Sequence, residues 1–284
     1  MRRSLLILLL AASLSACPGS AMDAAATRVA KGLQDGILNH DDVATVRDAL
    51  PGYMLTLDGL VEASPDNPQV ALAAAQLYAF FASNFASEPE RKKRLAERAR
   101  RYARQALCLE LTALCETLGA SFEEFAEEVE DIDDEEHVAL LYGFTTAWAV
   151  WIQANVEDWN AIADVAKIET LLKKVIALKP RYEKGMPYVY LGVLASQLPE
   201  AMGGKPDKAR EYFEEALTIS GERNLMAQVY YARQYARMVF DRKLHDQLLR
   251  EVVAADPRER GLTLSNILAQ EQARTLLAES QDFF

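Results

Sequence analysis

Apolar residues recur along most of this chain at spacings of three and four positions, the period of an amphipathic α-helix. In the stretch 89–109, for example, Leu95, Ala99, Tyr102 and Ala106 fall on one helical face. No run of alternating polar and apolar residues is long enough to predict a strand. The pattern therefore predicts an all-α protein with helices over residues 41–62, 67–86, 89–109, 135–156, 159–178, 187–198, 206–220, 224–240, 244–255 and 264–279.

Local signals mark several helix ends. Asn67 followed by Pro68 predicts a helix start, because the asparagine side chain can cap free amide groups and proline suits the first turn. Pro180 and Pro257 predict ends, since the residue before a proline is driven out of the helical conformation. Pro51, followed by glycine, predicts a break or kink inside the first helix.

The segment 138–154 has 17 residues without a charge. It is slightly short for a bilayer crossing and contains two threonines and a glutamine. We therefore expect a buried core helix there rather than a membrane span.

Two stretches of the chain resemble each other. Residues 99–107 match residues 209–217, with small, aromatic and small residues at the points where the second helix of a tetratricopeptide hairpin packs. Gly192 falls at the position in the first helix of such a hairpin where the absence of a side chain lets the two helices approach closely. Its distance of 17 positions from Ala209 is longer than in an ordinary repeat, so an extra loop is expected. We expect degenerate tetratricopeptide-like helical hairpins, stacked as an α-solenoid or bundle with capping helices; a helical bundle without repeats is the alternative.

The N-terminus has the features of an export signal. Arg2 and Arg3 precede an apolar run, which ends in Leu-Ser-Ala-Cys at Cys17. This ending resembles a bacterial lipobox, in which the cysteine is lipidated and becomes the new N-terminus. We predict a lipoprotein signal peptide at residues 1–16, lipidation of Cys17 and a mature helical domain at 17–284. A plain signal peptide with a free Cys17 is the alternative. Pro18 after the cysteine favours the inner leaflet of the outer membrane over the inner membrane, by resemblance to the usual sorting rule.

Composition and charge narrow the functional classes. The 284 residues are 50% hydrophobic and 26% charged, as in ordinary globular proteins, and the formal net charge is −11. A negative chain destined for export is a poor candidate for binding nucleic acid. Residues 123–136 hold ten acidic residues, expected to form a solvated, mobile loop. Residues 91–104 hold eight basic residues, expected to neutralise that segment or to face an acidic partner.

Nothing in the sequence indicates catalysis. His40, His137 and His245 are far apart, and no metal-binding, nucleophile-elbow or phosphate-loop motif is present. Surface or capping roles explain the histidines better than a dispersed triad. We expect a non-enzymatic protein with no metal and no cofactor.

Cys108 and Cys115 are candidates for a disulfide. Seven residues span about 10 Å along an unbroken helix, which is too far for a bond. The helix must therefore end between them for a bond to form, and no strong breaker is present. The oxidising compartment favours the disulfide, with two buried thiols as the alternative.

The lipobox and the degenerate hairpins occur together with a Pro-x-x-x-Gly-Gly-x-Pro-x-Lys-Ala insertion at 199–209. Together they resemble the T-component lipoproteins of TRAP transporters, the TatT-like family. Other similar stretches are 57–60, 106–108, 148–155 and 190–194. The resemblance implies an all-α periplasmic lipoprotein that forms trimers, works with a periplasmic solute-binding protein, and takes a hydrophobic or organic-acid ligand.

Ligand pockets have mostly apolar walls and a few polar groups. The aromatic and amide clusters are therefore the binding candidates, although core packing is the commoner role of any single aromatic. An asparagine inside an apolar face needs a hydrogen-bonding partner or a ligand. The candidate ligand-binding residues are Tyr78, Asn84, Trp148, Trp151, Asn155, Tyr188 and Tyr190. Trp148, Trp151 and Asn155 share one helical face and are expected to line a channel.

The inserted loop is a candidate for assembly, with Pro199, Gly203 and Gly204 as its turn residues. Two functions remain in competition. The first is an accessory lipoprotein of a TRAP-type system that binds or relays a ligand and docks a solute-binding subunit. The second is a tetratricopeptide-type adaptor lipoprotein that scaffolds an envelope complex.

Overall fold

The computed structural model describes residues 18–197 and 204–284, and every regular element within them is a helix. Cys17, Pro199 and Gly203 lie outside the described residues. The α-helices are α2 (Pro18–Leu38), α3 (Val43–Ala63), α4 (Pro68–Asn84), α5 (Pro89–Glu110), α6 (Thr112–Glu116), α7 (Phe122–Glu130), α8 (Val138–Ala154), α9 (Trp159–Ala163), α10 (Val165–Leu178), α11 (Met186–Ala195), α12 (Pro206–Ser220), α13 (Leu225–Tyr230), α14 (Arg242–Ala254) and α15 (Thr263–Phe283). Short connecting turns are η1 (Thr117–Gly119), η2 (Glu135–His137) and η3 (Tyr182–Gly185), and the π-helical η5 (Tyr231–Ala236) continues α13.

The all-α prediction is confirmed, and most predicted helices lie within two or three residues of their expected ends. Asn67 caps α4 by accepting hydrogen bonds from the amides of Gln69 and Val70. Three details differ. The predicted helix 159–178 divides into α9 and α10 at Asp164, and α3 continues through Pro51 without ending. The helices α2, α6 and α7 were not predicted.

Helix α8 is the central core element, as the uncharged segment predicts. Nine of its residues are buried, and it packs on α4, α5 and α10. In the part of the chain that the structure covers, no helix is long and apolar enough to cross a membrane.

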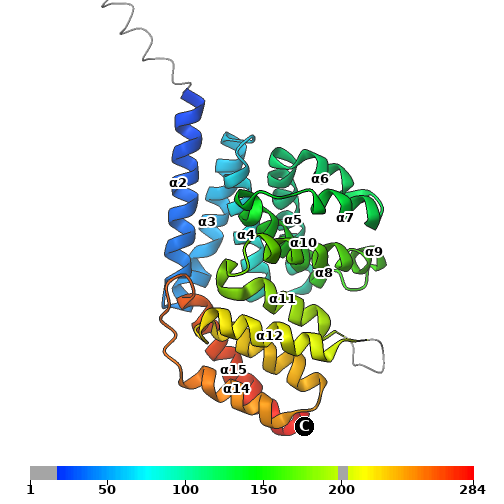
Figure 1. Ribbon diagram of the computed structural model, residues 1–284. Helices are drawn as coiled ribbons and strands as arrows, with labels where there is room; N and C mark the ends of the chain where they lie inside the picture. Colours follow the sequence, from blue (N-terminus) through cyan, green and yellow to red (C-terminus); the bar gives the residue numbers. More distant parts are fainter. Residues whose placement is uncertain (1–17, 198–203) are drawn as a thin grey trace, which may run out of the picture.

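Neighbouring helices pair as hairpins, most extensively α4 with α5 and α11 with α12. In the second pair Gly192 has the predicted role: a Cβ there would lie 2.9 Å from the buried ring of Phe213. Figure 1 shows α2 along one edge, the middle helices beside it, and α11, α12, α14 and α15 below.

The two ends of the helical chain meet. Helix α15 contacts α2 and α3, and the amide of Gly261 donates to the side chain of Asn39 at 2.8 Å. An open solenoid separates its first and last repeats, because each repeat contacts only its neighbours. Here the hairpins bend until the C-terminal helix lies beside the N-terminal ones (Figure 1).

Candidate functional site

The predicted binding residues are distributed over several environments. Tyr78 is buried between α3, α4 and α5, where its hydroxyl donates to Asp58 at 2.8 Å. Tyr102 donates to the other oxygen of Asp58 at 2.8 Å, and Arg98 lies 3.0 Å from the same carboxylate. Burial and the neighbouring carboxylate raise the pKa of Tyr102 to about 12. We call these four residues the Asp58 network, and its internal hydrogen bonds give it a structural role.

The two asparagines do not need a ligand, contrary to the argument from the sequence. The side-chain amide of Asn84 donates to the carbonyl of Phe80 at 2.9 Å, and that of Asn155 donates to Trp151 at 2.8 Å. Both are half-buried at the C-terminal ends of their own helices, where carbonyl groups lack helical partners.

The expected channel face of α8 does not enclose a shared space. Trp148 is only 2% exposed and packs against Phe125 and Phe144, with ring centroids 6.3 and 5.2 Å away. Trp151 is half-buried, and the guanidinium carbon of Arg100 covers its ring at 3.9 Å. This packing places Trp148 in the core and Trp151 at the surface. The prediction that these residues line a common channel is therefore wrong.

The other predicted tyrosines point in different directions from α11. Tyr188 packs towards α12, 6.4 Å from the ring of Tyr212. Tyr190 instead faces α8, where its ring centroid lies 6.2 Å from that of Tyr142. Tyr142 in turn lies 5.3 Å from Tyr182 of η3. The structure therefore joins Tyr190 to residues that the sequence did not bring together.

We call Tyr142, Tyr182, Tyr190, Tyr230 and Glu183 the tyrosine recess. The four tyrosines come from α8, η3, α11 and α13, and each is partly exposed. Even so, burial raises the pKa of Tyr142 well above its ordinary value, and it also raises the pKa of Tyr182 and Tyr190. The rings of Tyr182 and Tyr190 contact Tyr142 edge to face, and each ring keeps a partly exposed surface.

Glu183 carries the negative charge beside these rings. Burial raises the pKa of its carboxyl, although Lys184 opposes the shift. The charge of Glu183 in turn adds to the raised pKa values of Tyr142 and Tyr182. The lysine amine is directed elsewhere, because it pairs with Glu259 and donates to the carbonyl of Arg260 at 3.0 Å.

The backbone that presents Glu183 is strained. Three consecutive residues have left-handed conformations, with φ of 45° at Glu183, 50° at Lys184 and 85° at Gly185. Only glycine adopts this region freely, and strain of this kind is concentrated at functional sites. At Gly185 a Cβ would lie 3.0 Å from the carbonyl oxygen of Ala216, so α12 also requires a glycine there.

A family model for the TRAP transporter T-component matches residues 39–284. The chain belongs to this family. An uncharacterized protein of Treponema pallidum (strain Nichols) is 25% identical over 262 residues, which cover 86% of this chain and 81% of the relative. As a T component, the chain has an accessory role in TRAP transport.

The T-component match begins just after α2. This helix buries only Ala26 and Ala30 among the residues whose side chains are described. The tyrosine recess and the Asp58 network both lie inside the matched region.

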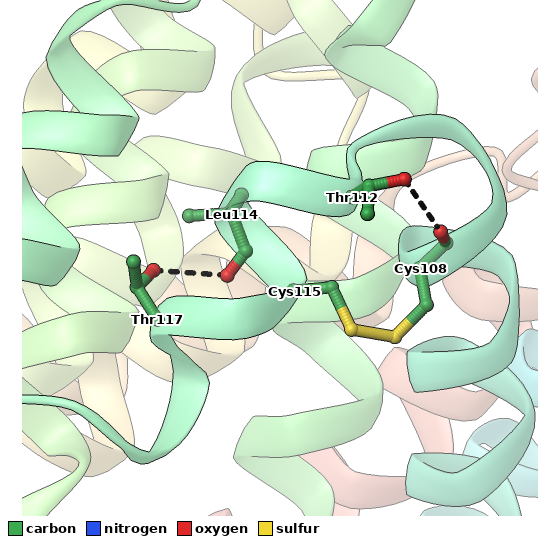
Figure 2. Close-up of a disulfide and its surroundings, with 5 residues drawn as sticks. All are labelled: Cys108, Thr112, Leu114, Cys115 and Thr117. Atoms are coloured by element: carbon green, nitrogen blue, oxygen red, sulfur yellow. Dashed lines mark hydrogen bonds between the residues drawn. A yellow bond between two sulfur atoms is a disulfide. The ribbon is translucent and has the colours of Figure 1, made fainter.

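The two remaining cysteines lie at the junction of α5 and α6. Helix α5 ends at Glu110, and Leu111 turns the chain so that the Cα atoms of Cys108 and Cys115 come within 5.0 Å. Figure 2 shows the disulfide across this turn, with Thr112 donating to the carbonyl of Cys108 at 3.2 Å. The helix thus ends between the two cysteines without a glycine or proline.

The charged stretches behave differently from the expectation. Residues 123–136 are mainly helical rather than a loop, because Ser121 and Glu124 form a capping box and Phe125 and Val129 are buried. Among the described residues, no ion pair joins this acidic stretch to the basic stretch 91–104.

The histidines do not form a catalytic arrangement. His245 is fully buried, contrary to the surface role expected, and its Nδ1 lies 3.0 Å from Asp246. Ser280 donates to the same carboxylate at 2.6 Å and not to the imidazole, so no nucleophile–base pair results. Within the described ranges, no group of three or more potential ligands is placed to hold a metal.

Proposed function

We propose that this T component is a lipid-anchored periplasmic lipoprotein, which binds a small organic ligand in the tyrosine recess and docks a solute-binding subunit of a TRAP system. The recess supports the ligand-binding part. Partly exposed aromatic rings from four separate elements, beside a strained turn, are features of a binding site rather than of a sealed core.

Detecting a ligand that stays bound during purification tests the ligand-binding part of the proposal directly. The protein would be purified under mild conditions and examined by native mass spectrometry. We expect an adduct in the wild type that is lost in Tyr190→Ala and kept in Tyr188→Ala, since the two tyrosines leave α11 on different sides. Equal retention by both variants would remove the recess from the proposal.

The anchor rests on the lipobox at Cys17. Cys17→Ser should move the protein from the membrane fraction to the soluble fraction with unchanged helical circular dichroism. A wild type that is soluble after export would contradict lipidation.

Assembly is assigned to the inserted loop. Deleting five residues from the stretch 199–204 should leave the thermal midpoint within a few degrees while weakening trimer formation or docking. Size-exclusion chromatography with light scattering measures the first effect, and pull-down with the solute-binding subunit measures the second. Global unfolding would instead make the loop part of the core.

An adaptor role is the second candidate. It is favoured by an exposed aromatic cluster, in which Phe240 is 72% and Phe283 43% exposed and their rings lie 6.1 Å apart. Contiguous exposed apolar surface often marks a protein interface. Crosslinking from position 240 in intact cells would show whether envelope assembly proteins or a TRAP subunit contact it.

A further inference from the structure

We propose that a second copy of this chain docks on the exposed tip between α8 and α9, and that it does so with a row of arginines on its own α5. This inference rests on the proposed function, in which the T component forms trimers. It names two surfaces that meet between copies, in addition to the inserted loop.

Three apolar side chains are exposed where α8 turns into α9, and we call them the apolar tip. Trp159 is 85% exposed, Val156 61% and Ile162 39%. The tip is held in place, because Asp158 caps α9 by accepting a hydrogen bond from the amide of Asn160 at 2.9 Å. Exposed tryptophans in fixed positions are prominent among the residues that dominate the energy of protein interfaces. The apolar tip therefore has the features of a docking surface.

Carboxylates surround the apolar tip. Glu157 and Asp158 belong to the same turn, and the ten acidic residues of 123–136 lie on α7 and the turns that follow it. Helix α10 contacts both α7 and α9, and Figure 1 shows these two helices at the edge of the molecule opposite α2. Within the described ranges, none of these carboxylates is in an ion pair. This end of the molecule repels anionic lipid and attracts a basic protein surface.

Helix α5 carries the complementary charge. Arg94, Arg101 and Arg104 are exposed and lie towards one side of the helix, at spacings of seven and three. Glu97 lies among them, so this side carries a net charge of +2. These three arginines form no ion pair in the part of the chain that the structure describes. Since the acidic and basic surfaces of one molecule do not pair with each other, a second copy supplies the partner that each lacks.

Arginines of α5 already stack on aromatic rings within the chain. The guanidinium carbon of Arg100 lies 3.9 Å from the ring centroid of Trp151, and that of Arg91 lies 5.2 Å from Phe81. Tryptophan is the ring that attracts a guanidinium most strongly. An arginine from a second copy can therefore cover Trp159 while its neighbours pair with the carboxylates. Such a contact joins different surfaces of two copies, so it closes into a ring when the rotation between copies fits.

Reversing the charge of each surface tests the pairing. One variant carries Glu127→Lys, Asp133→Lys and Glu157→Lys, and the other carries Arg94→Glu, Arg101→Glu and Arg104→Glu. Sedimentation equilibrium of the mature full chain in density-matched detergent measures association, and circular dichroism checks folding. We expect each variant to associate about tenfold more weakly than wild type. A variant with both sets of changes should return to within about threefold of wild type, because its two surfaces again attract each other.

The apolar tip has its own test and a matched control. Trp159→Ala should weaken association about tenfold, because it removes the aromatic anchor. Leu55→Ala removes a side chain of α3 that is 70% exposed and should leave association unchanged. Equal effects of the two substitutions would overturn the role of the tip.

The outcomes separate this inference from the proposed function. A trimer that forms equally well in every variant would overturn the pairing of these surfaces and leave the trimer standing. Weak association of both reversed variants without recovery in the combined one would also overturn the pairing. A wild type that stays monomeric at all concentrations would overturn both this inference and the trimer, and loss of solute-binding subunit from Trp159→Ala would then make that subunit the occupant of the tip.

Discussion

The Asp58 network and the tyrosine recess use the same chemistry, a carboxylate among tyrosines, with opposite results. Asp58 accepts two tyrosine hydroxyls and pairs with Arg98, so its charge is fully compensated. Glu183 lies among tyrosines at the turn η3, while its neighbour Lys184 is engaged by Glu259. The first arrangement joins three helices, and the second leaves an exposed carboxylate without an ion-pair partner among the described residues. Stability and binding are thus assigned to different tyrosine clusters.

The largest expected effect is on stability at the closed network. Asp58→Ala removes the acceptor of both tyrosines and the partner of Arg98, and should lower the free energy of unfolding by about 3 kcal/mol. Urea denaturation measures this loss. Glu183→Ala is the comparison and should change stability by less than about 0.5 kcal/mol. A greater loss at Glu183 would reverse the assignment.

The second-largest expected effect is the loss of stability on substituting Gly185 in the strained turn η3. Gly185→Ala forces a side chain into a left-handed backbone and against the carbonyl of Ala216, and should cost about 2 kcal/mol. Gly261 has a similar φ of 80° with open space around it, so Gly261→Ala should cost about 1 kcal/mol. Equal losses at the two glycines would show that α12 does not hold the turn closely.

Removing one tyrosine hydroxyl from each site compares how much that group stabilises the Asp58 network and the tyrosine recess. Tyr78→Phe deprives Asp58 of a buried donor and should cost about 1 kcal/mol. Tyr190→Phe should cost only a few tenths of a kcal/mol, because water can reach its partly exposed side chain. Thermal and urea unfolding of the two variants, measured in parallel, would sharpen the contrast.

The contrast also shows what the sequence could predict. Helix α8 could be predicted because its pattern is local. Gly192 could be predicted because it falls at the glycine position of the first helix of a tetratricopeptide hairpin, although its distance to the second helix is unusually long. Helix α7 was missed because its many acidic side chains obscured the two buried positions, Phe125 and Val129. Phe122, Phe125 and Val129 do have helical spacing, but the acidic residues around them led to the prediction of a solvated loop.

The recess was beyond sequence reasoning for a different reason. Tyr142 and Tyr182 are 40 positions apart, and only tertiary packing places their rings 5.3 Å from each other. The left-handed backbone at Glu183 has no signature either, since glutamate rarely adopts it. The sequence did offer one signal for the turn: Gly185 lies two positions before Pro187, which is typical of a tight turn immediately before a helix start.

The smallest expected effect is the pH dependence of stability that Glu183 contributes. Because burial raises its pKa above the ordinary value of 4.5, the folded protein holds this proton at pH values where the unfolded chain has lost it. Its contribution to stability therefore falls as the pH rises from about 4.5 through the folded pKa. Glu183→Gln removes this slope, so the stability of the variant relative to wild type should increase as the pH rises above about 4.5.

Variant and wild type must be compared at each pH, because other carboxyls contribute stability that changes with pH in the opposite direction. Hydrogen bonds from Ser280 and His245 hold the pKa of Asp246 below its ordinary value, against its desolvation, and Lys184 does the same for Glu259. The stabilisation that these two carboxyls give the folded protein is lost on acidification. It is the same in wild type and variant, so it cancels when their free energies of unfolding are subtracted. Glu222→Gln is the matched control, since Glu222 is also exposed and left-handed, with φ of 61°, and lies beyond the end of α12. A flat difference for Glu183→Gln, or an equal one for Glu222→Gln, would mean that the carboxyl of Glu183 is solvated and that the recess does not differ from the protein surface.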